Sequence, residues 1–409
     1  MIRADYAKWL ARGHEHEQAG RPIDAMVCYR RAINSNKHSV EAQYRLGQLL
    51  RGLGRHKEAR AAWRAGLALS PGDERLLLGV AGTARRAGAY SEAIDAYLRI
   101  GARMGVALSR VAQGDEAAYA DLSTVLGNGA AYRRWDNLAI TLAAAPPSAA
   151  RSAFLLELGG SRISEFPPLL LALTAEEMIA SGAFEQAREV LARAELLAQT
   201  IYDPEVLRRL ALAEASSGSS KSWAERYALR CVELVASTPQ VAWPRRTAGE
   251  PLRIAYLIMP GTPIVIGGVS VEPGAYLRAV VAAHPRERFA AKVYVVGDAA
   301  IESLAELLPA TVALEKLVIP AEPAVARRVA ESDPDALIDL TGMRAPLGLL
   351  LARRPARTLW TYPGLAGAHV APLPMHALPA LAASDEQVLT QHRLALERAL
   401  GEACAGCRA

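Results

Sequence analysis

The sequence predicts an array of paired helices followed by one parallel α/β lobe. Three observations lead to this fold class. Glycine, alanine and aromatic residues recur with a period of 34 over about the first hundred residues. A stretch with three prolines, 237–251, then follows the helical region. Beyond it, short apolar runs alternate with segments of helix length, as in parallel sheets whose strands are joined by helices.

The helical repeat rests on four aligned positions. Each repeat has a glycine, then an alanine five residues later, then an aromatic residue four residues after that; a small residue stands seven before the glycine. Glycine suits the turn between two helices because it has no Cβ. The small residue and the alanine suit the close helix contact, and the aromatic side chain fills the groove behind them. The four positions are occupied by Gly13, Gly20, Ala25 and Tyr29; Gly47, Gly54, Ala59 and Trp63; and Ala81, Gly88, Ala93 and Tyr97.

This register resembles that of tetratricopeptide repeats, which are helix–turn–helix units of 34 residues. We place the clear repeats at 6–39, 40–73 and 74–107, with Pro71 ending the second. Residues 108–236 are a degenerate continuation in which Gly182 again precedes Ala187 by five. Because such units bury their apolar faces against their neighbours, we expect 1–236 to fold without the lobe. The concave face of the array is the predicted site for a protein partner.

Composition narrows the functional classes. The 409 residues are 51% hydrophobic, with a net charge of +5 and pI near 9.0. No apolar run approaches the ~20 residues of a membrane span, and the first residues lack the apolar core of a signal peptide, so we expect no membrane association and a cytoplasmic location. The basic pairs are scattered, which argues against nucleic-acid binding. Cys404 and Cys407 form an isolated C-x-x-C in 386–409, a predicted C-terminal helix and tail, and we predict no metal site.

The second region, 252–385, reads as a single Rossmann-like lobe. Parallel strands buried on both faces are short and apolar, and helices of about ten residues connect them. We expect strands at 253–259, 291–296, 314–319, 336–340 and 358–362, with helices near 273–283, 300–308, 323–332 and 345–353. The glycines at 261, 267 and 268 lack the spacing of a dinucleotide-binding loop, so a plain turn is favoured there over a phosphate cradle.

Three short motifs in this lobe resemble a known family. They are DLTG at 339–342, RPA at 354–356 and YPG at 362–364. In this order, after helical repeats and a linker, they resemble the first catalytic lobe of the tetratricopeptide-containing O-GlcNAc transferase/SPINDLY group, glycosyltransferase family 41. The resemblance implies that the lobe is half of a GT-B fold. The family's peptide-binding asparagine ladder is replaced here by Ala11, Arg45 and Gly79.

The resemblance also implies where a ligand would bind. Open α/β sheets bind ligands beyond the carboxyl ends of their strands. The candidate binding residues there are Asp339, Thr341, Gly342, Tyr362 and Gly364. For Asp339 and Thr341 the alternative is that they cap the next helix, and for 362–364 that they form a structural turn. No catalytic residue is assigned.

Two departures from the family decide the predicted function. The stretch 260–274 contains no histidine, although the family places one there, and only the first of the family's two lobes has a counterpart. We therefore predict an interaction, scaffold or accessory protein with a non-catalytic glycosyltransferase-like lobe and no cofactor. The alternative is a protein O-glycosyltransferase that modifies Ser or Thr of a bound partner from a UDP-sugar.

The same departure predicts a second interface. In the two-lobed family, the carboxyl edge of this sheet faces a cleft that the other lobe closes. The apolar segments 263–269 and 365–373 both follow strand ends and so should lie at this edge. Because large exposed apolar patches usually mark interfaces, we expect the array, a second chain or a homo-oligomer to cover them.

Overall fold

A computed structural model describes residues 2–127, 135–217, 222–238, 243, 250–260, 264–266, 269–282, 287, 289–297, 301–317, 323–361 and 375–377. The chain divides into two compact units, 1–170 and 171–409. This division lies inside the helical region, and not at the 237–251 segment where the sequence changes character. In the described part of the chain, no helix is both long and apolar enough to cross a membrane.

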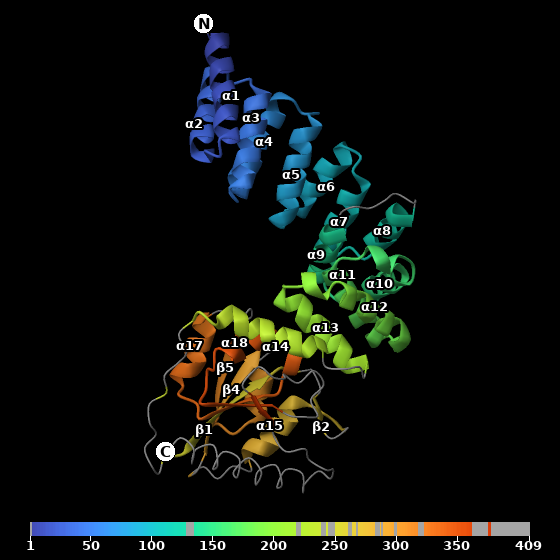
Figure 1. Cartoon of the computed structure of the whole chain (residues 1–409), viewed down its shortest axis with the longest axis vertical. Helices are drawn as coiled ribbons and strands as arrows, with labels where there is room; N and C mark the ends of the chain where they lie inside the picture. Colours follow the sequence, from blue (N-terminus) through green and yellow to red (C-terminus); the bar gives the residue numbers. More distant parts are fainter. Residues whose placement is uncertain are drawn as a thin grey trace. The chain divides into compact units, whose positions relative to one another are not determined.

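Paired helices make up the first unit (Figure 1). The helices of the first three predicted repeats are α1 (Ile2–Gln18) and α2 (Pro22–Ser35), α3 (Val40–Gly52) and α4 (His56–Leu69), and α5 (Glu74–Arg86) and α6 (Tyr90–Arg99). They are followed by α7 (Arg103–Gln113), α8 (Ala118–Gly127), α9 (Trp135–Ala144), α10 (Ala149–Arg162) and the short 3-10 helix η1 (Ile163–Glu165).

The repeat positions have the roles that their spacing predicts. The three turn glycines have φ between 67° and 74°, in the left-handed region that glycine favours. The alanines Ala25, Ala59 and Ala93 are fully buried. A Cβ on Gly47 would lie 2.2 Å from Trp63 Nε1, and one on Gly13 would lie 2.5 Å from the Tyr29 ring. The small residue is therefore required because the aromatic ring of the second helix lies against the first.

The third repeat is shorter than the predicted 74–107. Helix α6 has 10 residues, whereas α2 and α4 have 14, and α7 already begins at Arg103. A Cβ on Gly105 would lie 2.5 Å from the Tyr97 ring, much as one on Gly79 would lie 2.6 Å from Trp63. Gly105 thus packs against the aromatic residue of the preceding repeat, as Gly79 does. The next helix pair therefore starts before the end of the predicted third repeat.

The second unit contains the remaining helix pairs and the lobe. Its helices before the lobe are α12 (Phe184–Leu196), the 3-10 helix η2 (Ala198–Thr200), α13 (Pro204–Ser217) and α14 (Ser222–Val235). Helix α11 (Pro168–Ala180) lies almost entirely within this unit. The lobe helices are α15 (Pro273–Ala282), α16 (Ile301–Leu307), α17 (Pro323–Glu331), η3 (Gly342–Arg344) and α18 (Gly348–Ala352).

Six parallel strands form the sheet of the lobe. They are β1 (Leu252–Ile258), β4 (Phe289–Val296), β5 (Ala313–Leu317), β6 (Ala336–Asp339), β7 (Thr358–Thr361) and β8 (Met375–Ala377), in the spatial order β5-β4-β1-β6-β7-β8. The five predicted strands are confirmed, and β8 was not predicted. A two-stranded antiparallel hairpin, β2 (Ile264–Ile266) with β3 (Val269–Val271), was also missed.

Both faces of this sheet are covered. On one face, Tyr256, Val293 and Ile338 belong to an apolar core that also contains residues of α15 and α16. On the other, the hydroxyl of Tyr294 donates a 2.9 Å hydrogen bond to Ser332, just after α17. Figure 1 shows α15 on one side of the sheet and α17 and α18 on the other. This arrangement explains the continuous apolar strands in the sequence.

Candidate functional site

The strand order places a topological switch point between β1 and β6. From β1 the chain moves outward to β4 and β5, then crosses back to β6 and continues to β7 and β8. This is the 3-2-1-4-5-6 order of open, doubly wound sheets, whose ligand crevice lies beyond the carboxyl ends of the two strands at the switch. Asp339 is the last residue of β6, so three of the five predicted binding residues, at 339, 341 and 342, lie at this place.

The Asp339 carboxylate is occupied by its own turn. It is fully buried. One oxygen accepts hydrogen bonds from the Thr341 backbone N–H at 2.9 Å and from the Thr341 hydroxyl at 2.7 Å, and the other accepts from the Gly342 N–H at 3.2 Å. Gly342 has φ 57°, which glycine adopts without strain. These contacts fix the β6–η3 turn and give Asp339 a structural role there.

The remaining two predicted residues, Tyr362 and Gly364, lie outside the described residues, as does the segment 365–373. Sequence reasoning missed their neighbour Thr361. It ends β7, pairs with Asp339 in the sheet register and is only 5% exposed. Its hydroxyl is buried and has no hydrogen-bond partner among the residues that the structure describes. A threonine at the carboxyl end of a predicted parallel strand is the signal that could have identified it.

Helix α14 is bound directly to the segment that follows this turn. The hydroxyl of Tyr227 accepts a 3.0 Å hydrogen bond from the backbone N–H of Gly348, the first residue of α18. A Cβ on Gly348 would lie 2.4 Å from the Tyr227 oxygen and 2.7 Å from Cys231 Sγ. Burial raises the pKa of Cys231 to about 12 although a hydrogen bond to Tyr227 opposes this, so the thiol is not a nucleophile at neutral pH.

Helix α13 holds the other end of the same segment. Arg208 is 6% exposed and donates a 3.3 Å hydrogen bond to the carbonyl of Arg344, the last residue of η3. Its guanidinium is fixed by two hydrogen bonds to Glu205, of 2.6 and 2.8 Å. The last helix pair before the lobe therefore positions 342–348, the segment next to the Asp339 turn.

A part-buried carboxylate links α13 to the earlier helix α11. Glu176 of α11 accepts a 2.7 Å hydrogen bond from Arg209 of α13. Burial raises the pKa of Glu176, and the charges of Arg209 and Arg208 only partly offset it. Within the described residues, no group of His, Cys, Asp or Glu side chains is arranged to hold a metal ion.

The first helices of successive pairs carry a charged network on the array. Glu41 of α3 forms ion pairs with Arg45 at 2.8 Å and with Arg75 of α5 at 2.9 Å. The Arg75 guanidinium also lies 4.6 Å from the centre of the Tyr44 ring. Burial alone would raise the pKa of Glu41, but its bonds to both arginines outweigh burial and lower it. This network links the second repeat to the third.

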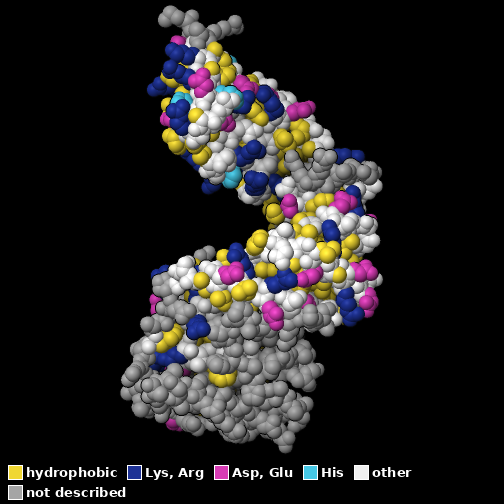
Figure 2. All heavy atoms as spheres, in the orientation of Figure 1, with side chains coloured by type: hydrophobic (Ala, Val, Ile, Leu, Met, Phe, Trp, Pro, Cys, Tyr) yellow, Lys and Arg dark blue, Asp and Glu magenta, His cyan; other side chains and the backbone are white. Residues whose placement is uncertain are grey.

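Next to this network lies an exposed apolar residue, Leu78 of α5, which is 50% exposed. The repeat position at which the family carries its asparagine ladder has other roles here, since Arg45 pairs with Glu41 and Gly79 lies against Trp63. Figure 2 shows basic, acidic and apolar side chains interspersed over the helices of the first unit on the face drawn. The α3–α5 surface is thus mixed in character and not a basic stripe.

Comparison with known protein families agrees with the prediction of helical repeats in the first part of the chain. Residues 10–74 and 50–107 match the tetratricopeptide repeat family. The front of the chain carries tetratricopeptide repeats. No curated protein matches the chain.

Solved structures show only distant likeness. An O-GlcNAc transferase mutant from Thermobaculum terrenum is 18% identical, with 90% of this chain and 51% of that one covered and a TM-score of 0.25. A tetratricopeptide repeat protein from Parabacteroides merdae is 15% identical, with 58% and 94% covered and a TM-score of 0.43. PilF from Pseudomonas aeruginosa is 16% identical, with 58% and 95% covered and a TM-score of 0.35. The chain spans about half the length of the O-GlcNAc transferase that it matches.

Proposed function

We propose that this protein is an interaction scaffold or accessory protein that holds a partner chain on its tetratricopeptide repeats, with a non-catalytic glycosyltransferase-like lobe. The observation that carries the proposal is the repeat geometry. Each helix pair completes its buried face with the next pair, as Trp63 does between Gly47 and Gly79. Stacked pairs of this kind create an extended surface for binding other chains.

The non-catalytic part of the proposal rests on the lobe. Both carboxylate oxygens of Asp339, the one acidic residue among the predicted binding residues, are engaged by the Thr341–Gly342 turn. The stretch 260–274 offers no histidine as a base. The lobe instead connects to helices α14 and α13 through Gly348 and Arg344, which suits an accessory role.

The test is capture of partners on a matched pair of surfaces. Wild-type protein, Leu78→Asp and Leu229→Asp are used as baits in extract of the native cell, and captured proteins are identified by cross-linking and mass spectrometry. Leu78 is 50% and Leu229 51% exposed, so both variants should fold. We expect Leu78→Asp to lose a partner that Leu229→Asp, on α14, retains. Equal retention by both variants would contradict the array as the binding surface.

One observation favours a second function, transfer of a sugar from a UDP-sugar to Ser or Thr of the partner. The sheet has the strand order of nucleotide-binding folds, and a polar turn lies at its switch point. Calorimetry with UDP-GlcNAc tests this for the whole chain. Absence of binding at millimolar nucleotide would end the enzymatic proposal for this chain alone. Hydrolysis of the UDP-sugar by purified protein would overturn the non-catalytic one.

A further inference from the structure

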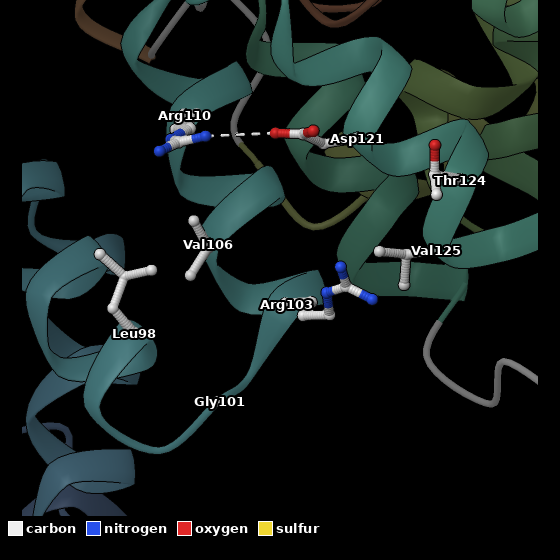
Figure 3. Close-up of a pocket in the computed structure, with 8 residues that line it drawn as sticks. All are labelled: Leu98, Gly101, Arg103, Val106, Arg110, Asp121, Thr124 and Val125. Carbon is white, nitrogen blue, oxygen red and sulfur yellow. Dashed lines mark hydrogen bonds and ion pairs between the residues drawn. The ribbon is translucent and has the colours of Figure 1, made fainter.

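A small hollow lies where the repeat register breaks, between the end of α6 and helices α7 and α8. It has a volume of about 200 Å³ and is lined by Leu98 and Gly101, by Arg103, Val106 and Arg110 of α7, and by Asp121, Thr124 and Val125 of α8 (Figure 3). All of these residues belong to the first unit. None of them belongs to the α3–α5 network or to the lobe.

Its walls combine apolar surface with an excess of positive charge. Leu98 is 58% exposed beside the hollow, and Val106 is buried in its wall. Arg110 pairs with Asp121 at 3.2 Å, drawn as the dashed line in Figure 3. Arg103, two helical turns earlier on α7, has no acidic partner among the residues that the structure describes. One carboxylate therefore balances only one of the two guanidinium groups.

The size of the hollow limits what it can take. At about 200 Å³ it lies below the ~300–1,000 Å³ of pockets that enclose whole small molecules. A nucleotide or a sugar nucleotide is too large, but an aliphatic side chain with a neighbouring carboxylate is not. An anionic group would receive charge-assisted hydrogen bonds from the Arg103 guanidinium, which can grip both oxygens of a carboxylate.

We propose that this hollow binds an acidic–aliphatic segment of a partner protein, with an aliphatic side chain on Leu98, Val106 and Val125 and an Asp or Glu carboxylate on Arg103. The inference rests on the proposed function, since it names the chemistry of a segment that the repeats would hold. Charge complementarity selects this occupant over a basic or a neutral apolar segment. Because Arg103 is exposed, the attraction is screened by salt.

The experiment measures fluorescence anisotropy of the full chain with a fluorescein-labelled peptide of five Asp-Leu pairs. A peptide of five Asn-Leu pairs is the neutral probe. We expect saturable binding of the acidic peptide that weakens with salt. We expect about 5–10-fold weaker binding for Arg103→Gln, in line with the ~1–1.4 kcal/mol of one exposed charge-assisted contact. Arg86→Gln is the matched control, because Arg86 is an exposed arginine outside the hollow.

Two further variants keep the test decisive. Leu98→Asp removes the apolar contact at a side chain that is already exposed, so it should lower affinity without unfolding the protein. Arg103→Lys should restore part of the affinity. Equal binding of the two peptides, or equal effects of Arg103→Gln and Arg86→Gln, would overturn the proposal. If Arg103→Gln captures as much of the cellular partner as wild type while Leu78→Asp loses it, the hollow is not the site but the scaffold function stands.

Discussion

Several helix pairs in this protein pack an aromatic ring against a glycine of the following segment, and the α3–α4 and α13–α14 pairs differ in where that glycine lies. In the α3–α4 pair, Trp63 packs against Gly79 of the next repeat, where a Cβ would lie 2.6 Å from the ring. In the α13–α14 pair, Tyr227 packs against Gly348 of the lobe, where a Cβ would lie 2.4 Å from the hydroxyl oxygen. The first contact is apolar and can be repeated. The second is completed by one specific hydrogen bond from Gly348 N–H.

This difference shows how a repeat array can end without exposing its last apolar face. A repeat offers its neighbour a generic ring-and-glycine contact, so it can be followed by another repeat. The last pair instead presents Tyr227, Cys231 and Arg208 to α18 and η3, which the lobe alone provides. The lobe thus takes the place of a capping repeat.

The largest expected effect comes from cutting the chain at the predicted boundary. A fragment of 237–409 lacks α13 and α14 and should not unfold cooperatively, whereas 171–409 should, because it keeps the Tyr227–Gly348 and Arg208–Arg344 contacts. Near-ultraviolet circular dichroism during thermal unfolding measures this. From the sequence, 1–236 is expected to fold without the lobe. If the last helix pair needs the lobe, a 1–236 fragment should stay folded over 1–170 and show fast hydrogen exchange in 204–235. A cooperative transition in 237–409 would show that the last pair is dispensable.

Overpacking a repeat contact should have the next largest effect. Ala59 is fully buried in α4, so Ala59→Trp should lower the free energy of unfolding by about 1–3 kcal/mol or more. Ala61 is exposed on the same helix, and Ala61→Trp should stay within about 0.5 kcal/mol of wild type. Urea unfolding compares the two. An unchanged midpoint for Ala59→Trp would mean that the assigned register is wrong.

A single methyl group tests the two glycine contacts side by side. Gly79→Ala and Gly348→Ala should each lower the free energy of unfolding by about 1–2 kcal/mol, because the new Cβ overlaps Trp63 or Tyr227. Gly82, also on α5, has nothing within 4 Å of the new Cβ, so Gly82→Ala should stabilise by about 0.5–1 kcal/mol. Stability that rises in all three variants in urea titrations would refute the proposed contacts.

The smallest effect is the pH dependence of the link between repeats. The pKa of Glu41 is lower in the folded protein than in the unfolded chain. Its contribution is therefore fully present above the unfolded value, near pH 4, and is lost as pH falls through the folded value. Glu41→Gln should cost less than about 1 kcal/mol at pH 7, because the pair is part-exposed, and less again at pH 2, where more of the Glu41 carboxylate is protonated. A cost that is the same at both pH values would show that charge is not its source.

Much of the fold could be predicted because its signals are local. Turn glycines, buried alanines and rings at 34-residue spacing predict the helix pairs, and apolar runs predict five of the six strands of the sheet. One local signal was overlooked. Ser39 and Asp73, 34 residues apart, cap α3 and α5 by accepting hydrogen bonds from the backbone N–H groups of Ala42 and of Arg75 and Leu76.

For the candidate site, the sequence predicted only its location at the end of a strand. It predicted that Asp339, Thr341 and Gly342 lie at a strand end, which is confirmed, but not that the carboxylate is used by its own turn. The hollow beside Leu98 was not predictable either, because it arises from the early start of α7.

The sequence by itself determined the repeat and the alternation of strands with helices, since both are regular patterns of residue type along the chain. Tertiary structure decided the spatial order of the strands and the early fourth pair. It also decided the attachment of Tyr227 to Gly348, 121 residues away. These features depend on which distant surfaces fill each other's gaps, and no periodicity along the chain encodes that choice.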